Sequence, residues 1–311
     1  MADKPAILIV QPHLGPVDGL LAGAFECHRA WEEPTAEALA RIEALVVAGE
    51  YPLDKPLIER LPALKHIAVF TSGYDGVDVP WARARGLVVT HAANVNAEDV
   101  ADHALGLILA SRRRIVDGDR IVKSGGWKPE DRLLTPSMTG RRVGLVGLGA
   151  IGAGLARRLE PMGCVIAWWG PRDKPTAPWP KAPDLLSLAR DSEVLVVCAK
   201  ASEETRGLID GAVIEAVGPQ GLLVNVSRGQ LVDEDALIAA LKTGRLGQAA
   251  LDVFAEEPTP GERWADVPNV VLTPHTAGAT QEAVQRMFGL LLQNLTAVLA
   301  GEPPVTPVPE I

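Results

Sequence analysis

The chain has 311 residues, enough for two domains that each bury a core of their own. Hydrophobic residues make up 47% of it and charged residues 22%, which excludes an intrinsically disordered or fibrous protein. The formal net charge of −9 repels phosphate backbones, so nucleic acid is not an expected partner. No apolar run approaches the roughly 18 residues that cross a membrane, and the first run is too short for a signal peptide, so we expect neither membrane insertion nor secretion.

The cysteines and histidines argue against disulfides and metal centres. Cys27, Cys164 and Cys198 are widely spaced and form no Cys-x-x-Cys pair, which is typical of a protein of the reducing cytoplasm. The six histidines show no metal-ligand spacing, so we expect no metal site. His103 lies in an apolar helical pattern and is interpreted as a core histidine bonded to one backbone group, rather than as a catalytic residue.

In chain order, short apolar runs alternate with longer helical patterns. Strands are predicted at residues 7–10, 44–47, 67–70 and 88–90, with helices at 36–42 and 57–61. A long apolar helix that begins after Asn96 leads into a second strand series at 142–146, 165–168, 194–198, 222–226, 249–253 and 270–272. The proline-rich segment 170–183 is expected to be an ordered loop, and a last helix spans 281–300.

This alternation predicts an α/β protein with two parallel sheets and crossover helices. We expect a doubly wound Rossmann domain at residues 97–280. A smaller, flavodoxin-like α/β domain is expected from residues 1–96 and 281–311 together.

A glycine-rich turn follows the first strand of the second series. The sequence Arg142-Val-Gly-Leu-Val-Gly147-Leu-Gly149-Ala-Ile-Gly152 is a strand that runs into G-x-G-x-x-G and then into a helix. The glycines allow a tight turn and a close approach of the backbone to a pyrophosphate, and the helix N-terminus offers N–H groups to the phosphates. In this context the motif predicts a dinucleotide site.

The acid that normally holds the adenosine ribose is missing. About 20 residues after the motif, at the end of the second strand, this chain has Gly170, followed by Pro171 and Arg172. No carboxylate there repels a 2′-phosphate, and Arg172 supplies a cation for it. NADPH is therefore the expected cofactor, with NADH possible but weaker. The alternative is that Arg172 is a solvated loop residue and that Asp173 binds the ribose.

An arginine, a carboxylate and a histidine are expected to converge at the carboxyl edge of the second sheet, where ligands bind. Arg228 follows one predicted strand, Glu257 the next and His275 the last. Such a set suits reduction of a 2-oxo acid, because the arginine binds a carboxylate and polarises the carbonyl while the histidine donates a proton. A carboxylate bonded to the histidine raises its pKa.

Four ordered motifs resemble the D-isomer-specific 2-hydroxyacid dehydrogenase family over nearly the whole chain. They are Gly147-Leu-Gly-Ala-Ile-Gly152, Asn225-Val-Ser-Arg-Gly-Gln-Leu-Val-Asp-Glu-Asp-Ala-Leu, Ala250-Leu-Asp-Val-Phe-Ala-Glu-Glu-Pro and Thr273-Pro-His-Thr-Ala-Gly-Ala-Thr. The resemblance implies that Arg228 is the catalytic arginine and His275 the acid–base histidine. It assigns the partner glutamate to Glu257 rather than Glu256, since Glu257 directly precedes the proline.

The resemblance also implies residues that hold cofactor and substrate. Asp252 matches the aspartate that binds the nicotinamide carboxamide, and backbone N–H groups of Ser72 and Gly73 match a loop that grips the substrate carboxylate. Leu53 matches a residue of the substrate pocket, with core packing as the alternative. The expected cofactor site comprises Gly147, Leu148, Gly149, Ala150, Ile151, Gly152, Gly170, Pro171, Arg172, Cys198, Thr205, Val226, Asp252, His275 and Gly278.

Within this family the chain looks most like NADPH-preferring glyoxylate/hydroxypyruvate reductases and related hydroxyphenylpyruvate reductases. We therefore expect NADPH-dependent reduction of a small 2-oxo acid, such as glyoxylate or hydroxypyruvate, to the D-2-hydroxy acid in a cleft between the domains. Two segments depart from the family pattern: His91-Ala-Ala-Asn94 replaces Asn-Thr-Pro-Gly, and Cys198-Ala-Lys200 replaces His-x-Pro. A homodimer is implied by the family's dimer arm, near residues 125–135, where Trp127 matches the arm tryptophan.

Three alternatives stay open. A bulkier 2-oxo acid such as hydroxyphenylpyruvate is one alternative substrate. A formate-dehydrogenase-like enzyme is disfavoured, because that family places an amide where Glu257 stands. A cofactor-sensing protein of the corepressor type shares the fold and the three residue types, but usually carries partner-binding extensions that are not expected after Pro309 here.

Overall fold

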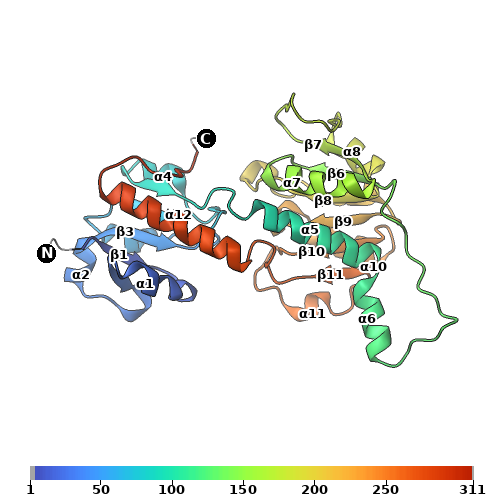
Figure 1. Cartoon of the computed structure of the whole chain (residues 1–311), viewed down its shortest axis with the longest axis horizontal. Helices are drawn as coiled ribbons and strands as arrows, with labels where there is room; N and C mark the ends of the chain where they lie inside the picture. Colours follow the sequence, from blue (N-terminus) through green and yellow to red (C-terminus); the bar gives the residue numbers. More distant parts are fainter. Residues whose placement is uncertain (1–3, 310–311) are drawn as a thin grey trace. The chain divides into compact units, whose positions relative to one another are not determined.

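A computed structural model describes residues 4–309 (Figure 1), so residues 1–3 and 310–311, at the outer ends of the predicted domain ranges, lie outside the described residues. The chain divides into two compact units. The terminal unit comprises the chain up to Val95 together with the chain from Gln281 onward. The central unit is Asn96–Thr280. Each unit is an α/β structure with one parallel sheet, which confirms the predicted fold class.

The terminal unit has a five-stranded sheet in the order β2-β1-β3-β4-β5, which is the flavodoxin-like order. Its strands are β1 (Ala6–Ile9), β2 (Glu26–Arg29), β3 (Ile42–Val47), β4 (His66–Val69) and β5 (Val88–Thr90). The sequence analysis missed β2. This strand reads Glu-Cys-His-Arg, lies at the sheet edge and is half-buried throughout, so it lacks the apolar run that reveals the buried strands.

Helices cover both faces of the terminal sheet. Side chains of α1 (Pro16–Leu21) and α12 (Gln281–Leu299) pack in one core, and those of α2 (Ala36–Arg41), α3 (Lys55–Glu59) and α4 (Val79–Arg83) pack in the other. The predicted helix at 57–61 begins earlier than expected. Asp54 caps it by accepting a hydrogen bond from Leu57 N, with Pro56 in the first turn.

The central unit has a six-stranded parallel sheet in the order β11-β10-β9-β8-β6-β7. Its strands are β6 (Arg142–Val146), β7 (Val165–Trp169), β8 (Val194–Val197), β9 (Leu222–Asn225), β10 (Gln248–Leu251) and β11 (Val270–Leu272), which confirms all six predicted strands to within a residue or two at their ends. The chain starts at β6 and winds outward in both directions. The loops after β6 and β8 therefore meet where the order reverses, the place where such sheets bind ligands.

Two helices, α5 (Ala97–Arg112) and α7 (Ala150–Leu159), lie together on one face of the central sheet (Figure 1). The other face is covered by α8 (Leu185–Asp191), α9 (Gly211–Val217) and α10 (Glu234–Lys242), with α11 (Gly261–Trp264) beside them. The predicted ordered loop at 170–183 is confirmed, because Trp168 N donates to Pro180 O at 3.0 Å and Ala182 N donates to Trp168 O at 2.7 Å.

A projecting arm interrupts the central unit between α5 and β6. It comprises α6 (Ile115–Lys123), which has no buried residue, and a following segment without helix or strand that returns to β6 (Figure 1). Among the described helices none is both long and apolar enough to cross a membrane.

Candidate active site

The glycine-rich loop after β6 forms the predicted strand, turn and helix. Gly147 has φ +97°, and a Cβ there would lie 2.9 Å from Ala199 N, so only glycine fits. A Cβ at Gly152 would lie 2.3 Å from Gly147 O, which lets α7 start directly above the turn. Nothing lies within 4 Å of the Cβ position at Gly149. The loop thus combines a tight turn, an open backbone position and the N-terminus of α7, a combination that fits a dinucleotide pyrophosphate.

The end of β7 shows that Gly170 is not required by the backbone. Its φ lies outside the left-handed range, and a Cβ would make only an ordinary contact, 3.6 Å from Trp168 Cζ3. Arg172 is exposed beyond it. Asp173, the alternative ribose ligand, is engaged elsewhere, because its Oδ1 accepts a hydrogen bond from Lys181 Nζ at 2.6 Å. Sterics therefore do not account for the missing acid.

The other predicted cofactor residues lie on loops at the carboxyl edge or beside the glycine loop. Cys198 directly follows β8, and burial raises the pKa of its thiol to about 12. Thr205 caps a turn by donating to Lys200 O at 3.1 Å. A Cβ at Gly278 would lie 2.2 Å from Asn96 Nδ2, so this glycine permits a close contact. Among the remaining residues Leu148 and Val226 are buried, Ile151 is half-buried, and Ala150 and Pro171 are exposed.

His275 and Glu257 form the predicted pair. His275 Nδ1 lies 2.6 Å from Glu257 Oε2, and Phe254 N donates to Glu257 Oε1 at 2.9 Å. The hydrogen bond that His275 donates to Glu257 outweighs burial and raises the pKa of His275. Burial opposes ionisation of Glu257, but hydrogen bonds from His275 and Phe254 N prevail and its pKa lies below the usual range. Each of the two side chains therefore stabilises the charged form of the other.

His275 has an unusual backbone. Its φ of +53° is in the left-handed region, where a residue other than glycine costs about 1–3 kcal/mol and persists only when its surroundings hold it. Its N–H donates to Asp252 O at 2.8 Å. The conformation turns the chain sharply after Pro274, at the point where the imidazole meets Glu257.

Arg228 lies beside this pair. Its positive charge lowers the pKa values of both Glu257 and His275, and its Nη1 donates to Ser227 O at 2.8 Å. The next residue, Gly229, lies against the backbone of Phe254, where a Cβ would approach the carbonyl oxygen to 1.9 Å. Only glycine therefore lets the Arg228 loop lie directly against the loop that carries Glu257.

Asp252 is 1% exposed and anchors the His275 loop. Its Oδ1 accepts hydrogen bonds from Thr273 Oγ1 at 2.5 Å and Thr276 N at 2.9 Å, and its Oδ2 accepts one from Ala277 N at 2.9 Å. Burial raises the pKa of a carboxyl, but these donors and His103 together hold the pKa of Asp252 below its ordinary value. The side chain thus holds protein backbone, in addition to any contact it makes with a cofactor.

Two positioning residues escaped the sequence analysis. Asn225, 1% exposed, accepts from Ser227 N at 3.1 Å and donates to Arg228 O at 2.9 Å, so it shapes the arginine loop. Glu234, 7% exposed, accepts from Ala255 N at 2.5 Å and from Arg263 Nε at 3.0 Å. Both residues stood inside a quoted motif. A polar residue inside such a motif was the one feature of the sequence that could have indicated these positioning roles.

The predicted substrate residues of the terminal unit lie on its own loops. Ser72 Oγ donates to Ala92 O at 2.6 Å, and Thr71 Oγ1 donates to Gly73 O at 2.9 Å. Leu53 is half-buried and packs against the core of the terminal unit.

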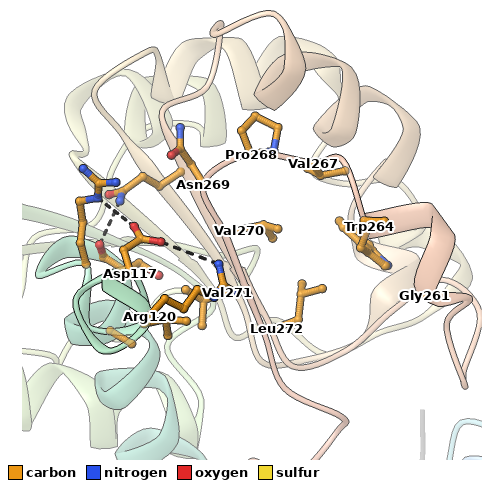
Figure 2. Close-up of a pocket in the computed structure, with 16 residues that line it drawn as sticks. Asp117, Arg120, Gly261, Trp264, Val267, Pro268, Asn269, Val270, Val271 and Leu272 are labelled. Carbon is orange, nitrogen blue, oxygen red and sulfur yellow. Dashed lines mark hydrogen bonds and ion pairs between the residues drawn. The ribbon is translucent and has the colours of Figure 1, made fainter. Parts of the chain in front are cut away.

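A cavity of about 520 Å³ lies elsewhere in the central unit, between α6, α11 and the edge strand β11 (Figure 2). Its wall combines Asp117 and Arg120 of α6 with Trp264 and Val271, and none of the predicted site residues lines it. Among the described residues no three His, Cys, Asp or Glu side chains cluster as metal ligands.

Comparison with known proteins places this site in a family. Residues 105–277 match the family profile described as D-isomer specific 2-hydroxyacid dehydrogenase, NAD binding domain. The chain is 38% identical over 307 residues to a glyoxylate/hydroxypyruvate reductase A of Arabidopsis thaliana, covering 97% of this chain and 98% of that one. A hydroxyphenylpyruvate reductase of Plectranthus scutellarioides is also 38% identical, with the same coverage.

A solved structure agrees along the whole chain. The NADPH-dependent glyoxylate/hydroxypyruvate reductase of Sinorhizobium meliloti, in complex with NADP and malonate, superposes with a TM-score of 0.90 at 36% identity and covers 98% of this chain and 97% of that one. The chain belongs to the D-isomer-specific 2-hydroxyacid dehydrogenase family, as its motifs predicted. It is an oxidoreductase that uses a nicotinamide cofactor.

Proposed function

We propose that this enzyme reduces a small 2-oxo acid, such as glyoxylate or hydroxypyruvate, to the D-2-hydroxy acid with NADPH. The observation that carries the proposal is the 2.6 Å contact between His275 Nδ1 and Glu257 Oε2, with Arg228 close enough to lower the pKa of both groups. The relatives named as glyoxylate/hydroxypyruvate reductases support this choice of substrate.

The three side chains have separate roles in the proposed reaction. Reduced nicotinamide supplies the hydride when it is bound. The guanidinium of Arg228 binds the substrate carboxylate and polarises the 2-oxo group. Because Nδ1 of His275 is bonded to Glu257, Nε2 is the nitrogen that donates a proton to the substrate oxygen. Glu257 raises the pKa of His275 and so stabilises the imidazolium that carries this proton.

The terminal unit is the proposed substrate domain and the central unit the proposed cofactor domain. Backbone N–H groups of Ser72 and Gly73 are proposed to bind the substrate carboxylate, with Leu53 beside the substrate. The hydroxyl of Thr71 holds this loop through Gly49 N and Gly73 O, at 2.9 Å each. Thr71→Val should therefore raise the KM for the 2-oxo acid more than the KM for NADPH.

The direct test is turnover of a substrate panel. Purified protein is mixed with NADPH and with glyoxylate, hydroxypyruvate or hydroxyphenylpyruvate, and nicotinamide absorbance is followed. Highest kcat/KM with the two small acids supports the proposal. Preference for hydroxyphenylpyruvate would assign the enzyme to the bulkier substrate, like the Plectranthus relative. Cofactor binding without turnover of any acid would favour the corepressor-type binding protein.

The preference for NADPH is proposed from the end of β7. Arg172 can add a charge-assisted hydrogen bond to the 2′-phosphate worth roughly 1.5–3 kcal/mol, or about 10–100-fold in affinity. Arg172→Ala should erode the preference chiefly through the cofactor KM. Gly170→Asp should shift it toward NADH, because a side chain fits there and restores the ribose ligand. Equal use of NADH by the unmodified enzyme would contradict the proposal.

A homodimer formed through the projecting arm is also proposed. Apolar side chains along α6 and the following segment face solvent, including Val122 at 62%, Trp127 at 67% and Leu134 at 87% exposure. A surface of this kind is typical of an interface. Trp127→Ser combined with Leu134→Ser should convert a dimer into a monomer in analytical ultracentrifugation. A monomeric unmodified enzyme would refute the dimer. The cytoplasmic location remains a prediction.

A further inference from the structure

His103 was interpreted from the sequence as a core histidine bonded to a backbone group, but its partner is a side chain of the active-site region. Its Nε2 lies 2.9 Å from Thr273 Oγ1 and 3.4 Å from Asp252 Oδ1. Helix α5 thus reaches the same carboxylate that anchors the His275 loop. This contact lies beside the His275 loop, because a single residue separates Thr273 from His275.

The hydrogen positions in this chain of contacts follow from donor chemistry. An ionised carboxylate only accepts hydrogen bonds, so at 2.5 Å the single hydroxyl hydrogen of Thr273 points to Asp252 Oδ1. The oxygen of Thr273 must then accept from His103, which places a hydrogen on His103 Nε2. The direction of donation runs from His103 to Thr273 to Asp252.

Asp252 in turn holds the loop that carries His275. Its two oxygens hold Thr276 N and Ala277 N, the residues directly after His275, and its carbonyl holds His275 N. These bonds define the turn in which His275 adopts its left-handed conformation. Because hydrogen bonds in a chain polarise one another, loss of the bond from His103 weakens the bond from Thr273 that orients the Asp252 carboxylate.

We propose that His103 is a positioning residue for catalysis: through Thr273 it orients Asp252, which holds the loop that aims His275 at Glu257 and the substrate. This inference rests on the proposed role of His275. The charged groups that face His275 are Glu257, Arg228 and Asp252, and of these only Asp252 contacts His103.

Matched substitutions separate positioning from packing. His103→Leu keeps bulk but removes the donor, and His103→Gln keeps an N–H at similar reach. We expect His103→Leu to lower kcat about 10-fold and His103→Gln to keep most of the activity. Thr273→Val should resemble His103→Leu, and the double variant should lose no more than Thr273→Val alone. His28→Leu, in the terminal unit, is the control histidine and should leave kcat unchanged.

Two measurements do not depend on turnover. Amide hydrogen exchange at Thr276 and Ala277 should become faster in His103→Leu and stay near that of the unmodified enzyme in His103→Gln. The pKa of His275, measured by NMR titration, should fall in His103→Leu only. If the unmodified enzyme reduces no 2-oxo acid, the proposed function fails while these two measurements still test the inference. Unchanged exchange in His103→Leu, equal impairment of His103→Leu and His103→Gln, or additive losses in the double variant would overturn it.

Discussion

The loops at the carboxyl edges of the two parallel sheets are held by different kinds of side chain. In the central unit, buried Asn225, Glu234 and Asp252 bond to the loops of Arg228, Glu257 and His275, and two of these three side chains are carboxylates. In the terminal unit, neutral side chains make several of the bonds that hold the corresponding loops, and Glu50 and His91 add one contact each, to Thr71 Oγ1 and to Ser72 O. Gln11 Oε1 accepts from Ala48 N at 3.0 Å, Thr71 Oγ1 accepts from Gly49 N at 2.9 Å, and Ser72 Oγ donates to Ala92 O at 2.6 Å.

The difference follows from what each edge is proposed to bind. A buried carboxylate that accepts several N–H bonds grips backbone strongly, which a strained residue such as His275 requires. A buried carboxylate in a loop that is to bind an anion would repel it, so neutral hydroxyls suit the loop of Ser72 and Gly73. In the proposed reaction, the central edge positions the proton donor and Arg228, and the terminal edge offers backbone N–H groups to the substrate carboxylate.

The largest effect should come from His275→Ala. Removal of a general acid typically costs about 10²–10⁴-fold, so kcat should fall by that factor while the Kd for NADPH stays nearly unchanged. Steady-state kinetics and cofactor titration measure the two quantities. Ser72→Ala, at the other edge, removes one neutral hydrogen bond and should change kcat far less. A His275→Ala enzyme with near-normal kcat would place the proton donor elsewhere.

Glu257→Gln should change the pH profile. Glu257 raises the pKa of His275, and reduction needs the protonated imidazole, so activity is lost as pH rises through that pKa. In the glutamine variant the pKa falls and the loss begins at lower pH. Near neutral pH, kcat should drop about 10–100-fold, the equivalent of one charge-assisted hydrogen bond. An unshifted profile would show that the two side chains are not coupled.

The terminal unit should respond to acid through His66 at the opposite, amino end of its sheet. This histidine is fully buried and its Nε2 contacts Thr90 Oγ1 at 2.8 Å, and burial lowers its pKa to about 4. The unfolded chain takes up this proton near 6.5, so stability is retained above that pH and lost as pH falls toward about 4, by roughly 3 kcal/mol.

Urea unfolding at several pH values measures this loss, and His66→Gln should flatten it by removing the titrating group while keeping a donor for Thr90. Hydrogen exchange in β4 assigns the change to the terminal unit. The same pH dependence in His66→Gln would mean that another group carries it.

The smallest effects are expected for substitutions of one loop-holding side chain at each edge, Glu234 in the central unit and Thr71 in the terminal unit. Glu234→Gln removes a charge that accepts from Ala255 N and Arg263 Nε and should cost about 1.5–3 kcal/mol. Thr71→Val removes neutral bonds and should cost about 1 kcal/mol. Each loss is read from the unfolding transition of its own unit. Equal losses of unfolding free energy in the two variants would show that a charged side chain holds its loop no more strongly than a neutral one.

The sequence alone determined the parallel sheets and the glycine loop, and it pointed to Arg228, Glu257 and His275 as the candidate catalytic residues. Buried parallel strands read as continuous apolar runs, and the glycine loop needs glycine for reasons that hold at each position separately, such as φ +97° at Gly147. Edge strand β2 escaped because half-exposed strands carry mixed residues. Local sequence patterns were sufficient to predict an element wherever its conformation depends only on neighbouring residues.

Only the tertiary structure decided which groups touch across long stretches of chain. His103 and Thr273 are far apart in sequence, and nothing around His103 distinguishes a residue that bonds backbone from one that bonds a threonine hydroxyl. Glu234 likewise reaches Ala255 from the start of α10. Such contacts depend on how helices pack over strand ends, and because a buried polar group must find a partner wherever the fold provides one, its partner is known only when the fold is complete.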